Sequence, residues 1–174
     1  MGTASLAVDQ FPDMSATPVA AGFAELYARH YEAVFRAALR VTGNAHDAED
    51  VLQTVFLRAY ARREQEEAAR HPGAYFRRAA VNAAVDLLRR RATHGENPLD
   101  EGTPGLAVER PVLLKEQLRR AIATLDQDDA ALFLLRYVEG LSNEELAAVF
   151  HQEKNNIAVR LHRIRQKLQA ELER

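Results

Sequence analysis

The sequence contains no cysteine, so disulfide frameworks, thiolate metal sites and cysteine nucleophiles are all excluded. No apolar run approaches the ~18 residues that are needed to span a bilayer, and we therefore expect no membrane insertion. The first twenty residues contain no lysine or arginine and include Asp9 and Asp13, so a secretory signal peptide is not expected. Together these absences predict a cytoplasmic protein.

Positive charge is also scarce for a protein that would bind DNA by itself. The formal net charge is −2, whereas isolated DNA-binding domains usually carry an excess of positive charge that contacts phosphates. The charge is instead segregated, because residues 96–110 hold four acidic residues and one basic, while every charged residue from Lys154 to Lys167 is basic. This pattern predicts weak DNA affinity for the chain alone, and a partner that holds it on DNA.

Apolar residues recur at helical spacing along most of the chain, with neither the alternation of a strand nor an internal repeat. The spacing predicts helices over residues 22–41, 44–60, 74–91, 113–125, 128–139, 143–150 and 155–173. Residues 62–70 are strongly charged and could prolong the second helix or form a loop. Residues 1–20 lack periodicity and are expected to be a disordered leader, and the Pro- and Gly-containing residues 92–111 a flexible linker. The expected fold is all-α, with two small helical domains at residues 21–91 and 112–174.

The last third of the chain has the pattern of a helix-turn-helix. Ser142 and Glu145 have the spacing of a capping box, which would begin a short apolar helix. After a polar break, Ile157, Leu161 and Ile164 form an apolar stripe on a helix whose other residues are mainly basic or polar. A helix held in this way, with amides and guanidinium groups on its free face, suits a DNA major groove. A helical hairpin with a solvated basic face is the alternative interpretation.

No set of residues indicates catalysis. The six histidines lack metal-ligand spacing, and neither a glycine-rich phosphate loop nor a nucleophile motif occurs. Residues 126–129 superficially resemble a calcium loop but lack its glycine and its closing glutamate, so Asp126 is interpreted as a helix cap. We therefore expect no enzyme activity, no metal and no cofactor.

Three strings, in this order along the chain, resemble a bacterial sigma factor of the extracytoplasmic-function (ECF) group. Residues 47–60 (DAEDVLQTVFLRAY) are similar to region 2.2, residues 74–91 to the segment that melts and reads the minus-10 element, and residues 140–163 to the region 4 helix-turn-helix, which reads the minus-35 element. The resemblance implies a transcription initiation factor whose partners are core RNA polymerase, promoter DNA and an anti-sigma factor. It places region 2 in the first expected domain and region 4 in the second. A helix-turn-helix regulator that binds DNA independently of polymerase is the alternative.

The resemblance also implies three sets of binding residues. The polymerase-binding set is Asp47, Asp50, Gln53 and Arg58, expected on the helix face opposite Val51 and Val55, together with Phe56. The minus-10 set is Arg77, Arg78, Asn82, Arg89 and Arg90, and the minus-35 set is Lys154, Asn155, Asn156, Arg160 and Arg163. Without the resemblance, the carboxylates and arginines would be interpreted as partners of the helix dipole, and Asn82 as an interhelical hydrogen-bonding residue.

Some positions depart from the family pattern. Tyr75 stands where the family usually has Trp, and we expect it in the core. Residues 63–73 contain no aromatic side chain that could stack on a flipped base. His151 occupies a turn where Gly is common, and Ala158 and Val159 replace a Lys-Ser pair. These differences predict minus-35 binding that is altered in preference or strength.

Overall fold

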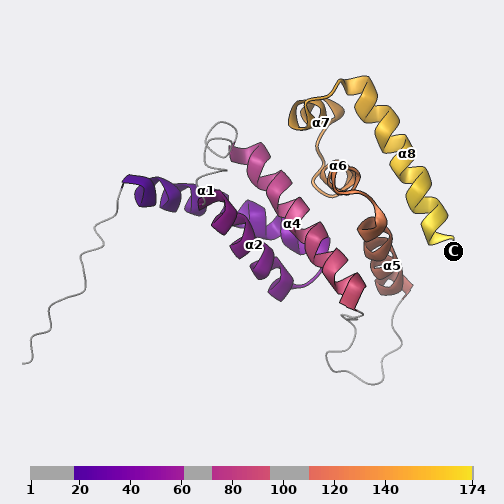
Figure 1. Cartoon of the computed structure of the whole chain (residues 1–174), viewed down its shortest axis with the longest axis horizontal. Coiled ribbons are helices and arrows are strands. Elements are labelled where there is room, and N and C mark those ends of the chain that lie inside the picture. The colour runs from indigo at the N-terminus through magenta and orange to yellow at the C-terminus, as the bar shows by residue number, and fades with distance from the viewer. Residues whose placement is uncertain (1–17, 61–71, 95–109, 174) are drawn as a thin grey trace, which may run out of the picture.

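A computed structural model describes residues 18–60, 72–94 and 110–173, and these residues form helices joined by short turns, without a strand (Figure 1). The helices are α1 (Pro18–Thr42), α2 (Ala45–Tyr60), α4 (Pro72–His94), α5 (Arg110–Thr124), α6 (Gln127–Tyr137), α7 (Asn143–Phe150) and α8 (Lys154–Leu172). The all-α prediction is confirmed.

Each predicted helix is present, with ends that differ by a few residues. α1 begins at Pro18, so the last residues of the predicted leader are helical, because proline suits a first helical turn, where its missing N–H is not needed. α4 continues to His94 and α5 begins at Arg110, so both ends of the predicted linker at 92–111 are also helical. The rest of the leader, the charged stretch at 62–70 and the middle of the linker lie outside the described residues.

Short-range signals set two of these helix boundaries. Gly43 ends α1 with a φ of +84°, and the side-chain oxygen of Asn44 accepts the Asp47 N–H at 2.8 Å at the start of α2. Ser142 and Glu145 form both hydrogen bonds of the capping box, with lengths of 3.2 and 2.8 Å. These contacts join residues at most three positions apart, and for this reason the sequence predicts them.

The first half of the chain is a three-helix unit in which α1, α2 and α4 pack on one another. Phe76 of α4 is fully buried at its centre, 5.1 Å from the Phe56 ring and stacked on His30 at 4.7 Å. The second half packs α8 against α5, α6 and α7. Its apolar stripe, Ile157, Leu161, Ile164 and Leu168, is buried as predicted.

α4 belongs to both halves, because it also packs against α5 and α6 (Figure 1). Alanines at positions 79, 80, 83 and 84 leave little side-chain volume on α4, so neighbouring helices can approach it closely. Two of them, Ala80 and Ala84, are completely buried. α4 is therefore the element through which the two halves contact each other.

The turn between α7 and α8 contains a strained residue, because His151 has a φ of +52°. A side chain in this left-handed region costs about 1 kcal/mol. We expect His151→Gly to raise the free energy of unfolding by up to about 1 kcal/mol, measured by urea denaturation followed by circular dichroism. The matched control is His162→Gly on the exposed face of α8, which should lower the same quantity by about 0.5–1 kcal/mol. Equal effects of the two substitutions would contradict the assignment of strain to His151.

Candidate nucleic-acid interface

The residues predicted to bind polymerase lie on α2, but not on one face. Asp50, Gln53 and Arg58 are exposed, whereas Asp47 and Phe56 are only 1% and 4% exposed. The prediction that Asp47 lies opposite Val51 is wrong. Asp47 precedes Val51 by four residues, and this spacing places the two on the same side of a helix.

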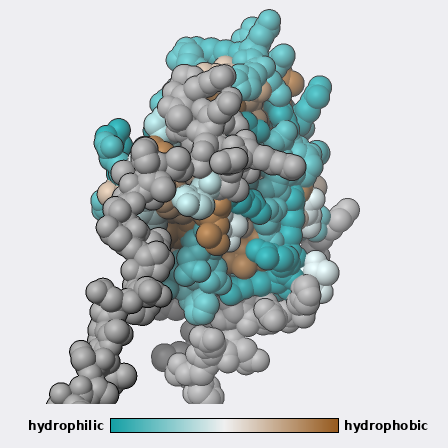
Figure 2. Space-filling model, turned by 60° about the vertical axis from the view of Figure 1, so that its left-hand side comes forward, coloured by the Kyte–Doolittle hydropathy of each residue, from teal (hydrophilic) through white to brown (hydrophobic). Residues whose placement is uncertain are grey.

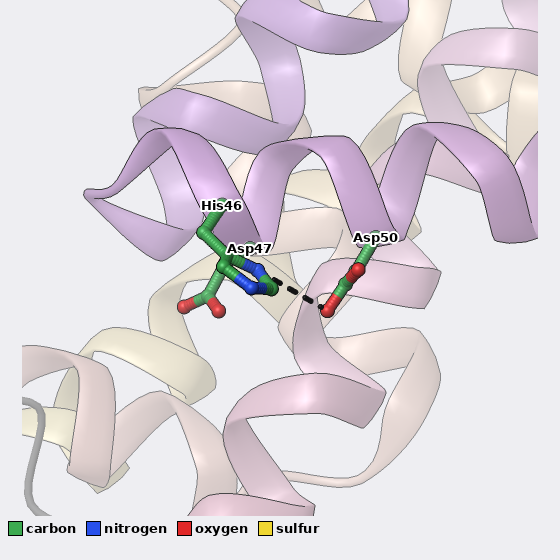
Figure 3. A group of neighbouring side chains, drawn as sticks. All are labelled: His46, Asp47 and Asp50. Atoms are coloured by element: carbon green, nitrogen blue, oxygen red, sulfur yellow. Dashed lines mark ion pairs between the residues drawn. The ribbon is translucent and has the colours of Figure 1, made fainter.

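Asp47 is buried because its carboxylate is fully paired. Arg91 of α4 forms an ion pair with one carboxylate oxygen, and the Asn44 amide donates to the other at 2.5 Å. Figure 3 shows Asp47 beside His46 and Asp50. His46 and Asp50 are exposed and form an ion pair of 3.6 Å with each other. These three side chains are close enough together to be considered as ligands of one cation. Arg91 already balances the Asp47 charge, so a link between α2 and α4 explains Asp47 better than a metal site does.

An apolar groove with a volume of about 430 Å³ runs beside Gln53 and is lined by Phe23, Tyr27, Gln53, Phe56, Leu57 and Tyr60. Leu57 is 71% exposed, and the rings of Tyr27 and Tyr60 are exposed as well. Figure 2, in which the left-hand side of Figure 1 comes forward, shows a small area of hydrophobic residues bordered by hydrophilic ones. The sequence signal for the groove is the apolar run at residues 55–57. Three consecutive side chains point to different sides of a helix, so one buried stripe cannot contain all of them and at least one is exposed.

Arg78, from the predicted minus-10 set on α4, faces the second half of the chain. Its guanidinium group donates to the Val149 carbonyl at 3.1 Å and lies 3.4 Å from the Asp128 carboxylate. It also lies over the Phe150 ring, 4.7 Å from the centroid. Arg78 therefore binds the C-terminal end of α7.

Arg89 makes the equivalent contact with the end of α5. It donates to the carbonyl oxygens of Ala123, at 3.3 Å, and of Leu125, and to the side-chain oxygen of Gln127. Gln127 in turn donates to the Asn82 carbonyl at 3.1 Å. The side-chain oxygen of Asn82 is buried without a hydrogen-bond partner in the described part of the chain. The face of α4 that carries Arg78, Asn82 and Arg89 is thus covered by the second half.

The other two arginines of this set lie at the edges of the covered face. Arg77 donates to the Gly73 carbonyl at 3.3 Å, and the exposed Arg90 donates to the Asp86 carbonyl at 3.4 Å. Hydrogen bonds from Ser142 hold the pKa of Glu145 below its ordinary value, and the positive charge of Arg77 lowers this pKa further. The five residues therefore do not form one continuous exposed surface.

The predicted minus-35 residues on α8 also separate into two groups. Lys154, Asn155, Asn156 and Arg163 are exposed, and Lys154 forms an ion pair with Glu144 of α7. Arg160 is half-buried, and its Nε donates to the Asp129 carboxylate at 2.6 Å. Burial acts to raise the pKa of Asp129, but hydrogen bonds from Arg160 and Lys167 outweigh it and hold the pKa below its ordinary value. The sequence did not indicate Asp129 as a partner of the recognition helix.

Comparison with known proteins identifies both halves. Residues 26–93 match the family model of sigma-70 region 2, and residues 115–168 match that of sigma-70 region 4. An RNA polymerase sigma-E factor of Streptomyces coelicolor is 30% identical over 157 residues, which are 86% of this chain and 85% of that protein. The ECF RNA polymerase sigma factor SigE of Mycolicibacterium smegmatis is 30% identical over 174 residues, which are 95% of this chain and 66% of that longer protein. The chain belongs to the ECF sigma factors of RNA polymerase.

The fold of this sigma factor is also similar to a solved structure. CnrH, in complex with the cytosolic domain of CnrY, superposes with a TM-score of 0.51 and 25% identity, over 88% of each chain. Family membership makes the chain a transcription initiation factor associated with RNA polymerase, and not a regulator that acts independently of it. None of the helices in the described segments is both long and apolar enough to cross a membrane.

The buried position of Asp47 leads to a stability prediction. Asp47→Ala leaves Arg91 without its buried carboxylate, and we expect the free energy of unfolding to fall by about 3 kcal/mol, measured by urea denaturation. The matched control is Asp50→Ala, which removes only an exposed partner of His46 and should change the same quantity by less than about 1 kcal/mol. If both substitutions change the free energy of unfolding by less than about 1 kcal/mol, Asp47 does not form a buried ion pair.

Proposed function

We propose that this sigma factor binds core RNA polymerase and directs it to promoters by recognising minus-10 and minus-35 DNA. In this proposal residues 21–91 act as region 2, residues 112–174 as region 4 and residues 92–111 as the linker. This proposal is based on one observation, which is that the chain has two different binding surfaces. The first is the apolar groove between α1 and α2, and the second is the exposed polar face of the helix-turn-helix on α8.

The groove and the polar residues beside it suit a protein partner. Leu57 and the two tyrosines offer exposed apolar area, while Asp50 and Gln53 add a negative charge and an amide that can pair with basic and polar groups. Arg58 is exposed on the same helix. We assign core polymerase to this surface, with Asp50, Gln53 and Arg58 in direct contact and Asp47 and Phe56 supporting the surface from below.

The exposed face of α8 suits the minus-35 element. Asn155 and Asn156 carry amides that can read adenine, and Arg163 can bind guanine or a phosphate. All three are exposed and make no polar contact within the described segments. With a net charge of −2, this sigma factor is expected to bind DNA weakly by itself, so polymerase would supply the remaining affinity.

The minus-10 assignment requires a change of arrangement. Arg78, Asn82 and Arg89 would contact DNA, but in the described structure they contact α5, α6 and α7. We therefore assign this structure to a closed form, from which region 4 must move away before α4 can bind the minus-10 element. Arg77 and Arg90, at the edges of this face, are the members of the set that could contact DNA first.

Several further properties follow from the proposal. DNA and polymerase are cytoplasmic in bacteria, so we assign the protein to the cytoplasm. A factor that acts by binding needs no catalytic group, metal or cofactor, and we propose that it is not an enzyme. CnrH was solved with the cytosolic domain of CnrY, which supports an anti-sigma factor as a further partner of this chain.

A double substitution tests the docking surface. We expect Asp50→Arg with Gln53→Ala to abolish co-purification with core polymerase, because it reverses a charge and removes an amide beside the groove, while the helicity stays unchanged. The control is Glu32→Arg, which reverses an exposed charge on α1 away from the groove. Recovery of polymerase with the double variant at the wild-type yield would overturn the docking assignment.

A second double substitution tests the closed form. Gln127→Ala with Asp128→Ala removes side-chain contacts to Arg89, Asn82 and Arg78 and leaves the arginine bonds to helix carbonyls in place, so we expect the halves to separate more often and single-stranded minus-10 DNA to bind more tightly. Because the sequence has no cysteine, dyes can be attached to cysteines introduced at two exposed alanines, on α1 and on α8. Energy transfer between the two dyes should be lower in the Gln127/Asp128 variant than in the wild-type protein.

The control for this experiment is Glu173→Ala, which removes an acidic side chain at the exposed end of α8. It should leave both energy transfer and DNA affinity at the wild-type level. Unchanged energy transfer in the Gln127/Asp128 variant would show that these contacts do not hold the two halves together.

A further inference from the structure

A buried carboxylate links α6 to the recognition helix α8. Asp129 is 6% exposed and accepts hydrogen bonds from two cations of α8, Arg160 at 2.6 Å and Lys167 at 3.3 Å, one on each oxygen. A second carboxylate, Asp126, lies 3.9 Å from the Arg160 guanidinium group. These four residues join the beginning of α6 to the middle of α8.

The position of Asp129 on α6 makes it a firm attachment point. It lies in the first turn of the helix, where the free amides favour a negative charge. Its own N–H donates to the Asp126 side chain at 2.9 Å, which fixes the backbone around it. Because Arg160 and Lys167 are seven residues apart, they lie on one side of α8, and the single carboxylate spans about two helical turns.

The buried stripe of Ile157, Leu161, Ile164 and Leu168 holds one side of α8 by apolar packing. The adjoining side, which carries Arg160 and Lys167, borders a hollow of about 530 Å³. Asn156 and Arg163, both assigned to minus-35 DNA, line the same hollow. The ionic contacts of Asp129 therefore add to the apolar packing in setting the rotation of α8 about its axis.

We propose that Asp129 is a positioning residue for minus-35 recognition, which holds Arg160 and Lys167 and so sets the angle at which α8 presents Asn155, Asn156 and Arg163 to DNA. The proposal rests on the function of α8 proposed above. It changes the role of Arg160, which the sequence assigned to DNA contact. Arg160 acts through Asp129, and the exposed residues of α8 read the promoter.

Two other roles for these residues make different predictions. If Arg160 contacted a phosphate, its removal would weaken binding to every promoter and reduce the salt dependence of binding by about one unit. If Asp129 instead competed with DNA for Arg160 and Lys167, its neutralisation would strengthen binding to every promoter and make the salt dependence steeper. Positioning alone predicts a loss of preference between sequences.

The experiment uses the full chain assembled with core RNA polymerase and a promoter library randomised at the minus-35 element. With Asp129→Asn, which keeps the size of the side chain and removes its charge, we expect the enrichment of preferred over non-preferred elements to fall about tenfold. The salt dependence on non-preferred DNA should stay at the wild-type value. Thermal unfolding of the variant, followed by circular dichroism, checks that it is folded.

A double variant separates positioning from DNA contact. Asp129→Leu with Arg160→Met replaces the ion pair by apolar side chains of similar size, a change that folded proteins often tolerate well. It restores a contact between α6 and α8 but has no guanidinium group at position 160. We expect its enrichment to return to within about twofold of wild type, because the helix is held again while the residues that read DNA are unchanged.

Each outcome decides one question. A wild-type holoenzyme that enriches no minus-35 sequence overturns the proposed function of α8. Wild-type enrichment that persists in Asp129→Asn overturns the positioning role of Asp129. A double variant as defective as Asp129→Asn, with a reduced salt dependence, assigns Arg160 to DNA contact and also overturns the proposal. Loss of preference in Asp129→Asn with recovery in the double variant supports it.

Discussion

Arginine side chains that donate to free carbonyl oxygens at helix C-termini hold the two halves of this sigma factor together. Arg78 binds the end of α7, Arg89 the end of α5, and Arg119 of α5 donates to the Val41 carbonyl at the end of α1 at 3.0 Å. The last carbonyls of a helix have no partner within it and carry partial negative charge, so a guanidinium group with its five donors matches them well. The guanidinium group of Arg119 occupies the space beside Gly43, where a Cβ would lie 2.1 Å from its terminal nitrogen, so any other residue at position 43 would make the Arg119 side chain shift.

The same chemistry explains why α4 can serve two purposes. A guanidinium group that binds helix carbonyls and a neighbouring carboxylate has the donors that a phosphate would use, but it cannot bind both at once. In the proposed mechanism Arg78 and Arg89 therefore release region 4 before they bind promoter DNA. Most of these contacts are partly exposed, so water can replace them when region 4 leaves. This replacement lowers the free energy that is needed to release region 4.

Two buried carboxylates connect helices in a related way within each half. Asp47 joins α2 to α4 through Arg91, and Asp129 joins α6 to α8 through Arg160. Both lie in the first turn of their helix, where the dipole favours them, so each partner arginine completes an already favourable site. Neighbouring charged residues on the same helices are exposed and accessible to partners, such as Asp50 on α2 and Arg163 on α8.

The sequence by itself determined the helices, some of their ends and most of their apolar stripes. The Gly43 and Ser142 signals and the stripe from Ile157 to Leu168 depend on residues within a few positions of each other, and a local pattern encodes such contacts fully. The family strings added the order of the two regions. Only the tertiary structure decided which polar side chains of those helices are free. Arg160 meets Asp129 across 31 residues, and Arg78 meets Val149 across 71, so these pairings depend on how whole helices pack and not on spacing along the chain.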